Sequence, residues 1–228
     1  IDVLASAFDS AGQRCSALRV LCLQDEIADH TLKMLRGAMA ECRMGNPGRL
    51  TTDIGPVIDS EAKANIERHI QTMRSKGRQV FQAVRENSED TREWQSGTFV
   101  APTLIELDDF AELQKEVFGP VLHVVRYNRN QLPALIEQIN ASGYGLTLGV
   151  HTRIDETIAQ VTGSAHVGNL YVNRNMVGAV VGVQPFGGEG LSGTGPKAGG
   201  PLYLYRLLAN RPESALAVTL ARQDAEYP

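Results

Sequence analysis

Short runs of consecutive apolar residues alternate along this chain with apolar residues spaced three or four positions apart. The runs are typical of buried strands, and the wider spacing is typical of one face of a helix. Because the two patterns follow one another through most of the chain, we predict an α/β fold: an open, mostly parallel sheet with helices on both faces. The predicted strands lie at 20–23, 80–84, 98–101, 103–107, 121–127, 146–150 and 169–173.

Helices are expected between these strands, where the apolar spacing changes. Asp59 and Asn130 are the expected N-caps of two of them. Gly45, Gly77 and Gly143 stand where the first three helices should end. The predicted helices lie at about 25–42, 60–76, 131–142 and 155–164, with a shorter one at 202–208.

Other segments fall outside this alternation. Residues 85–95 are polar and are interpreted as a solvated loop, and glycine becomes dense from Gly178 to Gly200. The apolar run at 215–220 is a last predicted strand. Residue 1 is Ile rather than Met, and neither end resembles a terminus, so we expect the chain to be a piece of a longer polypeptide.

The composition is typical of a soluble globular protein. Hydrophobic residues make up 43% of the 228, and the longest apolar run, at 177–183, is far shorter than the roughly 20 residues of a membrane span. The net charge is -4, and Lys and Arg are dispersed rather than gathered into a basic patch for nucleic acid. We therefore expect neither a membrane span nor nucleic-acid binding.

The cysteines indicate a reducing compartment and no metal site. Cys15, Cys22 and Cys42 are too few for a disulfide framework, they lack CxxC spacing, and the five histidines show no metal-ligand spacing. Cys22 falls in a predicted strand and Cys42 on the apolar face of a predicted helix, so both are expected to be small core residues. Cys15 lies outside both elements.

Cys15 belongs to the segment with the most chemical content, Gly12-Gln13-Arg14-Cys15-Ser16. A cysteine that follows a glycine turn and adjoins an arginine can expose a thiolate, which is the nucleophilic form. About a hundred residues later, Glu116 and Phe118 precede Gly119-Pro120, a rigid turn that would hold a carboxylate and an aromatic ring in place. Together the segments indicate half of an active site, and no general base is obvious nearby.

One glycine motif invites a different interpretation. Residues 188–193 match the dinucleotide fingerprint G-x-G-x-x-G, but glycine and proline continue to Pro201 where a helix should begin. We interpret the motif as irregular backbone lining a site. A cysteine hydrolase remains an alternative; it would need a histidine folded next to Cys15, and nothing in the sequence selects one.

Further short motifs complete a family pattern. With the segments around Cys15 and Glu116, they resemble the aldehyde dehydrogenase superfamily in order and spacing over nearly the whole chain. Residues 15–19 and 178–182 are most similar to the Δ1-pyrroline-5-carboxylate dehydrogenases, and 199–206 resembles the form fused to proline dehydrogenase in bacterial proline utilization A flavoenzymes. The motifs are Gly45-Asn46-Pro47, Gly55-Pro56, Pro102-Thr103, Tyr144-Gly145-Leu146, Val172-Asn173, Pro185-Phe186-Gly187-Gly188 and Ser192-Gly193.

The resemblance implies roles in chemistry and cofactor binding. Cys15 matches the nucleophile that attacks an aldehyde, with its backbone N–H as one arm of the oxyanion hole. Glu116 matches the carboxylate that holds the nicotinamide ribose of NAD, and Phe118 matches the aromatic residue beside it.

The resemblance also implies a substrate, L-glutamate γ-semialdehyde, which would be oxidised to L-glutamate in proline catabolism. Ser16, Gly178 and Ala179 match the anchor of its carboxylate, which consists of a hydroxyl and two backbone N–H groups. Phe186 matches an aromatic wall around its aliphatic chain.

The same resemblance shows what the sequence lacks. In the family, a Glu-Leu-Gly-Gly motif with the general base, the oxyanion-hole asparagine and the nucleotide-binding region precede the nucleophile, and none is present here. Residues 1–210 are therefore expected to be a catalytic-domain fragment without the NAD-binding domain, inactive alone. Residues 211–228 are expected to be a terminal segment with an oligomerisation-type strand.

The expected partners are the aldehyde, the rest of the parent polypeptide and, in the parent, further copies of it. A parent fused to proline dehydrogenase would also bind FAD, although not through this segment. The expected location is the bacterial cytoplasm. Peripheral association with the inner membrane remains an alternative for the parent protein. A dehydrogenase of another aldehyde and a non-catalytic assembly module remain alternatives.

Overall fold

The computed structural model describes residues 1–83 and 97–208. The α-helices within these ranges are α1 (Asp2–Phe8), α2 (Asp25–Glu41), α3 (Ser60–Ser75), α5 (Leu132–Ala141) and α6 (Asp155–Ser164). The strands are β1 (Val20–Gln24), β2 (Val80–Gln82), β3 (Thr103–Leu107), β4 (Val121–Tyr127), β5 (Tyr144–Gly145), β6 (Thr147–Val150), β7 (Asn169–Val172) and β8 (Glu189–Gly190). Short 3₁₀ helices are η1 (Asp9–Gly12), η2 (Phe110–Glu112), η3 (Arg129–Gln131) and η4 (Tyr203–Leu207).

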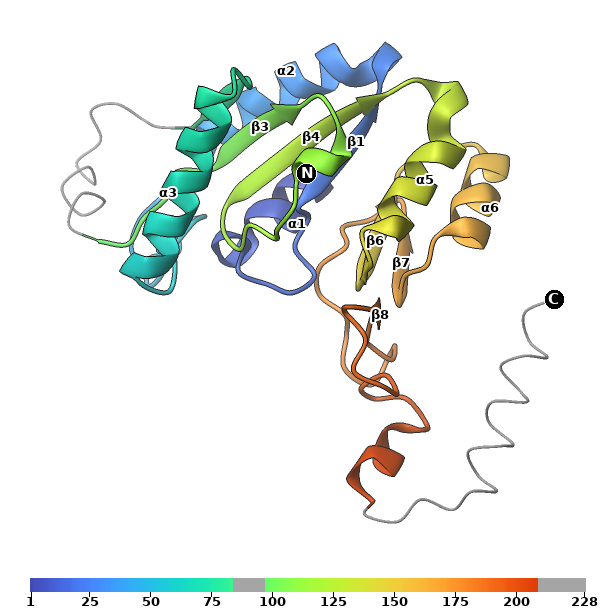
Figure 1. Ribbon diagram of the computed structural model, residues 1–228. Helices are drawn as coiled ribbons and strands as arrows, with labels where there is room; N and C mark the ends of the chain where they lie inside the picture. The colour runs from blue at the N-terminus through green and yellow to red at the C-terminus, as the bar shows by residue number, and fades with distance from the viewer. Residues whose placement is uncertain (84–96, 209–228) are drawn as a thin grey trace.

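The main sheet has four strands in the order β1-β4-β3-β2. β1 and β3 both run parallel to β4, whereas β2 runs antiparallel to β3. A second sheet pairs β6 with β7 in parallel, and β5 pairs with β8 antiparallel. Figure 1 shows β6 and β7 on the β1 side of the main sheet, below α5. The predicted mostly parallel α/β architecture is confirmed.

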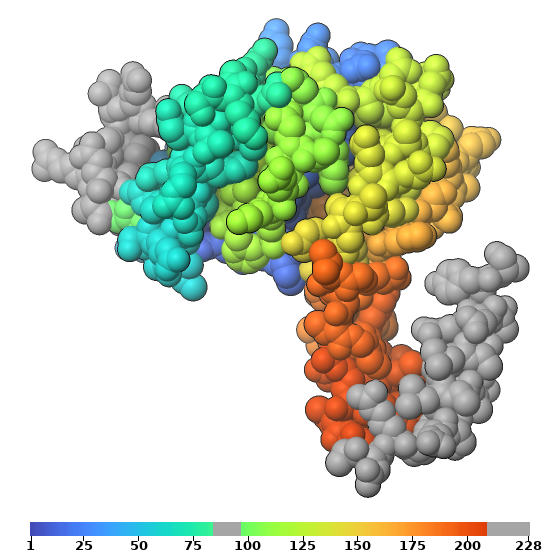
Figure 2. All heavy atoms as spheres, in the orientation of Figure 1, coloured from blue at the N-terminus to red at the C-terminus, as the bar shows by residue number. Residues whose placement is uncertain are grey.

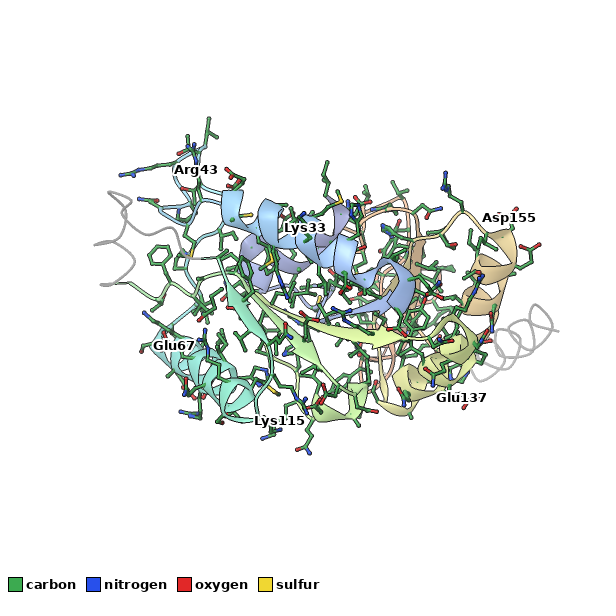
Figure 3. All side chains as sticks on the ribbon, turned by 90° about the horizontal axis from the view of Figure 1, so that it is seen from above. Lys33, Arg43, Glu67, Lys115, Glu137 and Asp155 are labelled. Carbon is green, nitrogen blue, oxygen red and sulfur yellow. The ribbon has the colours of Figure 1, made fainter. Side chains whose placement is uncertain are left out.

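The hydrophobic core lies between the main sheet and the helices on its two faces. Figure 3 shows α2 on one side of the strands and α3 and α5 on the other. The central strands β3 and β4 are buried on both faces, as covered parallel strands are. The inward residues of α2 and α3 are Ala28, Leu32, Leu35, Met39, Ile66, Ile70 and Met73.

Helix ends confirm some of the predicted caps and correct others. The Asp59 side chain accepts a hydrogen bond from the Ala62 N–H at the start of α3, as expected of an N-cap. Asn130 does not cap α5; it lies in η3, and α5 begins after Gln131 with a proline in its first turn. Gly45 is not a C-cap either, because α2 already ends at Cys42 in extended backbone.

Two predicted elements take another form. Residues 98–101 are not a strand: among the described residues Thr98 exchanges hydrogen bonds with Val57, and Pro102, which follows, has no N–H to continue a ladder. Residues 202–208 form the 3₁₀ helix η4 instead of an α-helix. The predicted loop at 85–95 and strand at 215–220 lie outside the described residues, and the division at residue 210 stays a prediction.

The glycine-rich segment after β7 projects from the body of the molecule (Figure 2). Phe186 and Ala198 exchange two backbone hydrogen bonds within it, and the Lys197 ammonium donates to the Gly168 carbonyl oxygen. A Cβ on Gly168 would overlap the backbone of Gly187, so this contact requires glycine. Within residues 1–83 and 97–208, no helix has both the length and the apolar character needed to cross a membrane.

Candidate functional site

Cys15 lies in an exposed turn between η1 and β1. The Ala17 N–H donates to the Arg14 carbonyl oxygen across this turn at 3.1 Å, and no acceptor for the Cys15 N–H lies in the described part of the chain. Ser16 is buried, and its carbonyl oxygen accepts from the Thr147 hydroxyl at the start of β6 at 3.4 Å. The turn therefore presents a thiol and a free backbone donor together, on a support that contacts both sheets.

The Cys15 turn packs directly against the loop that precedes β4. Gly12 has a φ of +65°, and a Cβ there would overlap the Gly119 carbonyl oxygen and lie 2.9 Å from the Ala7 carbonyl oxygen. Only glycine combines this backbone conformation with so close a contact. The two segments singled out in the sequence are thus brought together.

Glu116 and Phe118 protrude from this loop beside the Cys15 turn. The Phe118 ring is 45% exposed, while Val117 between them and Gly119 after them are buried. Figure 3 shows Lys115 at the outer edge of the molecule, beside α3. Buried residues therefore hold the backbone, and the carboxylate and the ring remain accessible.

Arg19 joins the two segments, and sequence reasoning assigned it no role. Its Nε donates to Glu116 Oε1 at 3.0 Å, and its guanidinium carbon lies 4.6 Å from the centre of the Phe118 ring. Its Nη1 donates to the Gly12 carbonyl oxygen at 2.6 Å and its Nη2 to the Arg14 carbonyl oxygen at 2.9 Å. The Arg19 side chain is only 13% exposed.

The arginine that faces the site is therefore Arg19, where the sequence suggested Arg14. The Arg14 side chain is exposed and donates to the Ser10 hydroxyl at 3.0 Å. Burial lowers the pKa of the Arg19 guanidinium, and the negative charges of Glu116 and of a Cys15 thiolate act in the opposite direction. No spacing rule could have selected Arg19, because its contacts depend on the fold of the loop before β4.

The residues predicted to anchor the substrate lie farther along the chain. Met176, two residues before Gly178, donates its N–H to the Ser6 hydroxyl at 3.1 Å, which ties this segment to α1. The N–H groups of Gly178 and Ala179 have no acceptor within the described ranges. No hydrogen bond between described residues joins Gly178, Ala179 or Phe186 to the Cys15 turn.

The other two cysteines are structural. Cys22 lies in β1, where burial raises the pKa of its thiol to about 12. Cys42 is half-buried just after the end of α2 and packs against the hydrophobic core, as expected, and its thiol donates to the Ala38 carbonyl oxygen at 3.6 Å. The raised pKa disfavours a thiolate at Cys22.

The histidines give no support to a cysteine hydrolase. His69 and His123 hydrogen-bond to each other at 2.8 Å, and His151 pairs with Asp2 at 3.3 Å. None of these contacts involves Cys15. In the described part of the chain, no group of three or more His, Cys, Asp or Glu residues could hold a metal ion.

The glycine motif at 188–193 is not a dinucleotide loop. Its first residues form β8, which pairs with β5, and a turn rather than a helix follows. A phosphate loop of that kind needs a helix N-terminus at this point.

Comparison with known proteins agrees with this architecture. The model of the aldehyde dehydrogenase family matches residues 2–209, and the chain belongs to that family. It is 98% identical, over its whole length, to the bifunctional protein PutA of Escherichia coli strain K12. The chain spans 17% of the length of that relative.

Solved structures show the same fold. A crystal structure of a variant of proline utilization A from Bradyrhizobium japonicum matches with a TM-score of 0.82 and 51% identity, over 89% of this chain and 20% of that one. A 1-pyrroline-5-carboxylate dehydrogenase from Thermus with bound NAD matches with a TM-score of 0.76 and 36% identity, over 89% of this chain and 38% of that one. The family resemblance of the sequence motifs is confirmed, and the roles of single residues stay predictions.

Proposed function

We propose that this chain carries the nucleophile, part of the NAD site and the substrate anchor of an L-glutamate γ-semialdehyde dehydrogenase of proline catabolism. The observation that carries the proposal is the position of Cys15. Its thiol is exposed, its backbone N–H has no acceptor in residues 1–83 and 97–208, and its turn contacts the loop bearing Glu116 and Phe118. A nucleophile, an oxyanion donor and a cofactor contact are what aldehyde oxidation through a thioester requires.

In this reaction the Cys15 thiolate adds to the aldehyde carbon and forms a thiohemiacetal, whose oxygen the Cys15 N–H stabilises. When bound, NAD supplies the hydride acceptor that converts this adduct into a thioester. Water then hydrolyses the thioester, which releases L-glutamate and restores the thiol. Among the described residues, Glu116 Oε2 has no hydrogen-bond donor, and Phe118 exposes its ring, so the pair is suited to hold a ribose and its nicotinamide.

The proposed substrate class rests on the free donors near Gly178. The consecutive N–H groups of Gly178, which has a φ of +78°, and Ala179 have no acceptor among the described residues, and such a pair suits a carboxylate without a basic side chain. A Cβ on Gly178 would meet no atom within 4 Å, so there is open space before this backbone. The names of the PutA and 1-pyrroline-5-carboxylate dehydrogenase relatives agree with this substrate.

For the full-length protein we propose what the relatives' names imply. PutA is named bifunctional, so we expect a proline dehydrogenase part with FAD elsewhere in the polypeptide and a homo-oligomer to which residues 211–228 contribute a strand. We expect the protein in the bacterial cytoplasm.

The test uses full-length PutA in which the matching segment carries this sequence. Cys15→Ser should lower NADH formation from L-glutamate γ-semialdehyde by about 10³-fold or more, because the alkoxide equivalent of serine is not formed at neutral pH. Cys22→Ser is the matched control, since that thiol is buried in β1, and it should retain the rate. A Cys15→Ser enzyme that keeps its activity would contradict the proposed function.

The same assay tests the substrate class. Ser16→Ala and Gly178→Val should raise the KM for the semialdehyde by about tenfold or more and leave the KM for a simple aliphatic aldehyde nearly unchanged. Equal effects on the KM of both substrates would contradict the proposed carboxylate anchor. The chain would then belong to a dehydrogenase of another aldehyde.

A further inference from the structure

The Arg19 guanidinium is shared between the two halves of the proposed site. On one side it donates to the carbonyl oxygens of Gly12 and Arg14, which flank Gln13 in the turn leading to Cys15. On the other side its Nε donates to Glu116, and its Nη1 lies 3.4 Å from the Gly119 carbonyl oxygen. One side chain thus contacts backbone and side-chain groups that are about a hundred residues apart in sequence.

These contacts use the planar, forked shape of arginine. A guanidinium carries five N–H donors in a fixed plane, and four hydrogen bonds leave from the three nitrogens of Arg19 in different directions. The guanidinium carbon of Arg19 also lies over the Phe118 ring, at a distance typical of a cation–π contact. A lysine ammonium could neutralise Glu116, but it could not reach both loops and stack on the ring as well.

The ion pair leaves Glu116 available. Arg19 binds only Oε1, the Glu116 side chain is 42% exposed, and Oε2 has no donor in the part of the chain that the structure describes. The carboxylate is therefore held in orientation by one oxygen while the other faces outward. An unsupported glutamate on an exposed loop would have to lose rotamer freedom when it binds a ligand.

We propose that Arg19 is a positioning residue that joins the Cys15 turn and residues 116–118 into one rigid unit, fixing Glu116 for the cofactor ribose. The proposal rests on the proposed function of Cys15 and Glu116. It adds a residue that touches neither substrate nor cofactor and acts through the groups that do.

The experiment compares Arg19→Met, Arg19→Lys and Arg14→Met in full-length PutA carrying this sequence. Arg14 is the matched control because it is the arginine directly before Cys15, and its side chain contacts Ser10 and not Glu116. R19M should raise the Kd for NAD about tenfold and change the rate of iodoacetamide alkylation of Cys15 by about threefold or more, because the Cys15 turn loses two hydrogen bonds that hold its backbone. R19K should fall between R19M and the parent, and R14M should stay within about twofold of the parent in both measurements.

A double-mutant cycle separates positioning from general loosening of the fold. If Arg19 acts through Glu116, R19M should weaken NAD binding far less in an E116Q background than in the parent. Independent effects of R19M and E116Q on NAD binding would overturn the proposal, and so would an R19M enzyme that matches R14M. If R19M does not fold, the same double-mutant cycle is measured with R19K and E116Q.

The readouts distinguish this proposal from the proposed function. NAD binding and Cys15 alkylation need no turnover, so they report on Arg19 even if Cys15→Ser leaves the dehydrogenase active. Loss of activity in Cys15→Ser together with unchanged NAD binding in R19M would refute the role of Arg19 alone.

Discussion

At the scale of single residues, burial decides the protonation of a histidine pair behind the candidate site. His123 in β4 is fully buried, with Nδ1 3.1 Å from the Arg19 carbonyl oxygen and Nε2 2.8 Å from Nε2 of His69. Because a carbonyl oxygen can only accept, Nδ1 of His123 carries the proton, and its Nε2 accepts from His69. The pair is thereby satisfied in its neutral form.

This pair should make stability depend on pH. Burial lowers the pKa of His123 to about 4, and burial also lowers the pKa of His69. The unfolded chain then binds more protons than the folded chain between about pH 6.5 and 4. The stabilisation is therefore present above pH 6.5 and is lost as the pH falls toward 4. For His123 the loss in the free energy of unfolding is about 3 kcal/mol.

Urea unfolding of the chain at several pH values measures this loss. His123→Gln should flatten the decline between pH 6.5 and 4, because an amide does not titrate. His30→Gln, which removes an exposed imidazole on α2, is the control. An unchanged decline in His123→Gln would show that the acid sensitivity arises elsewhere.

At the scale of elements, periodicity predicted strands and helices well where their own side chains decide the structure. Val121–Tyr127 and Asp155–Ser164 form β4 and α6 with the predicted bounds. The prediction was wrong where neighbouring segments decide the structure: residues 98–101 have strand-like side chains, but no described strand pairs with them to form a ladder. The segment Asp2–Phe8 was not predicted as a helix, and its buried residues Ser6, Ala7 and Phe8 support the turn before Cys15.

The contact between that turn and the β4 loop gives a prediction at this scale. Gly12→Ala should destabilise the chain by about 2–4 kcal/mol, because it combines a strained positive φ with overlap of the Gly119 carbonyl. Gly77→Ala is the matched control, since Gly77 has a φ of +78° but open space around a Cβ, and it should cost about 1 kcal/mol. Urea unfolding compares the two, and equal costs would mean that the close contact adds nothing.

At the scale of the whole molecule, the described residues form a mixed main sheet, the parallel pair of β6 and β7, and a projecting glycine-rich segment (Figure 1). The Thr147 hydroxyl at the start of β6 donates to the Ser16 carbonyl oxygen of the Cys15 turn. The chain spans 17% of its PutA relative in Escherichia coli. It contains no Glu-Leu-Gly-Gly motif and no dinucleotide fingerprint followed by a helix. The half-site proposed for it therefore has a candidate nucleophile and a candidate ribose contact, and no candidate general base.

We accordingly expect the 228-residue chain alone to form no NADH from L-glutamate γ-semialdehyde. Its Cys15 should still be alkylated faster than Cys22, because the first thiol is exposed and the second has a raised pKa. NADH formation is followed by absorbance and alkylation by mass spectrometry, with full-length PutA as the positive control. Robust NADH formation by the chain alone would contradict the assignment of the base to another part of the polypeptide.

The sequence by itself determined the fold class, most strands and helices, and the family, because these depend on local periodicity and on short motifs. It also supplied the candidate site residues, whose roles stay predictions. It could not determine which arginine contacts both the Cys15 turn and Glu116. The motif suggested Arg14, but that side chain contacts Ser10, and Arg19 reaches Glu116 where the backbone of Gly12 packs against Gly119. Contacts between segments a hundred residues apart depend on strand order and close backbone packing, and those were decided by the tertiary structure.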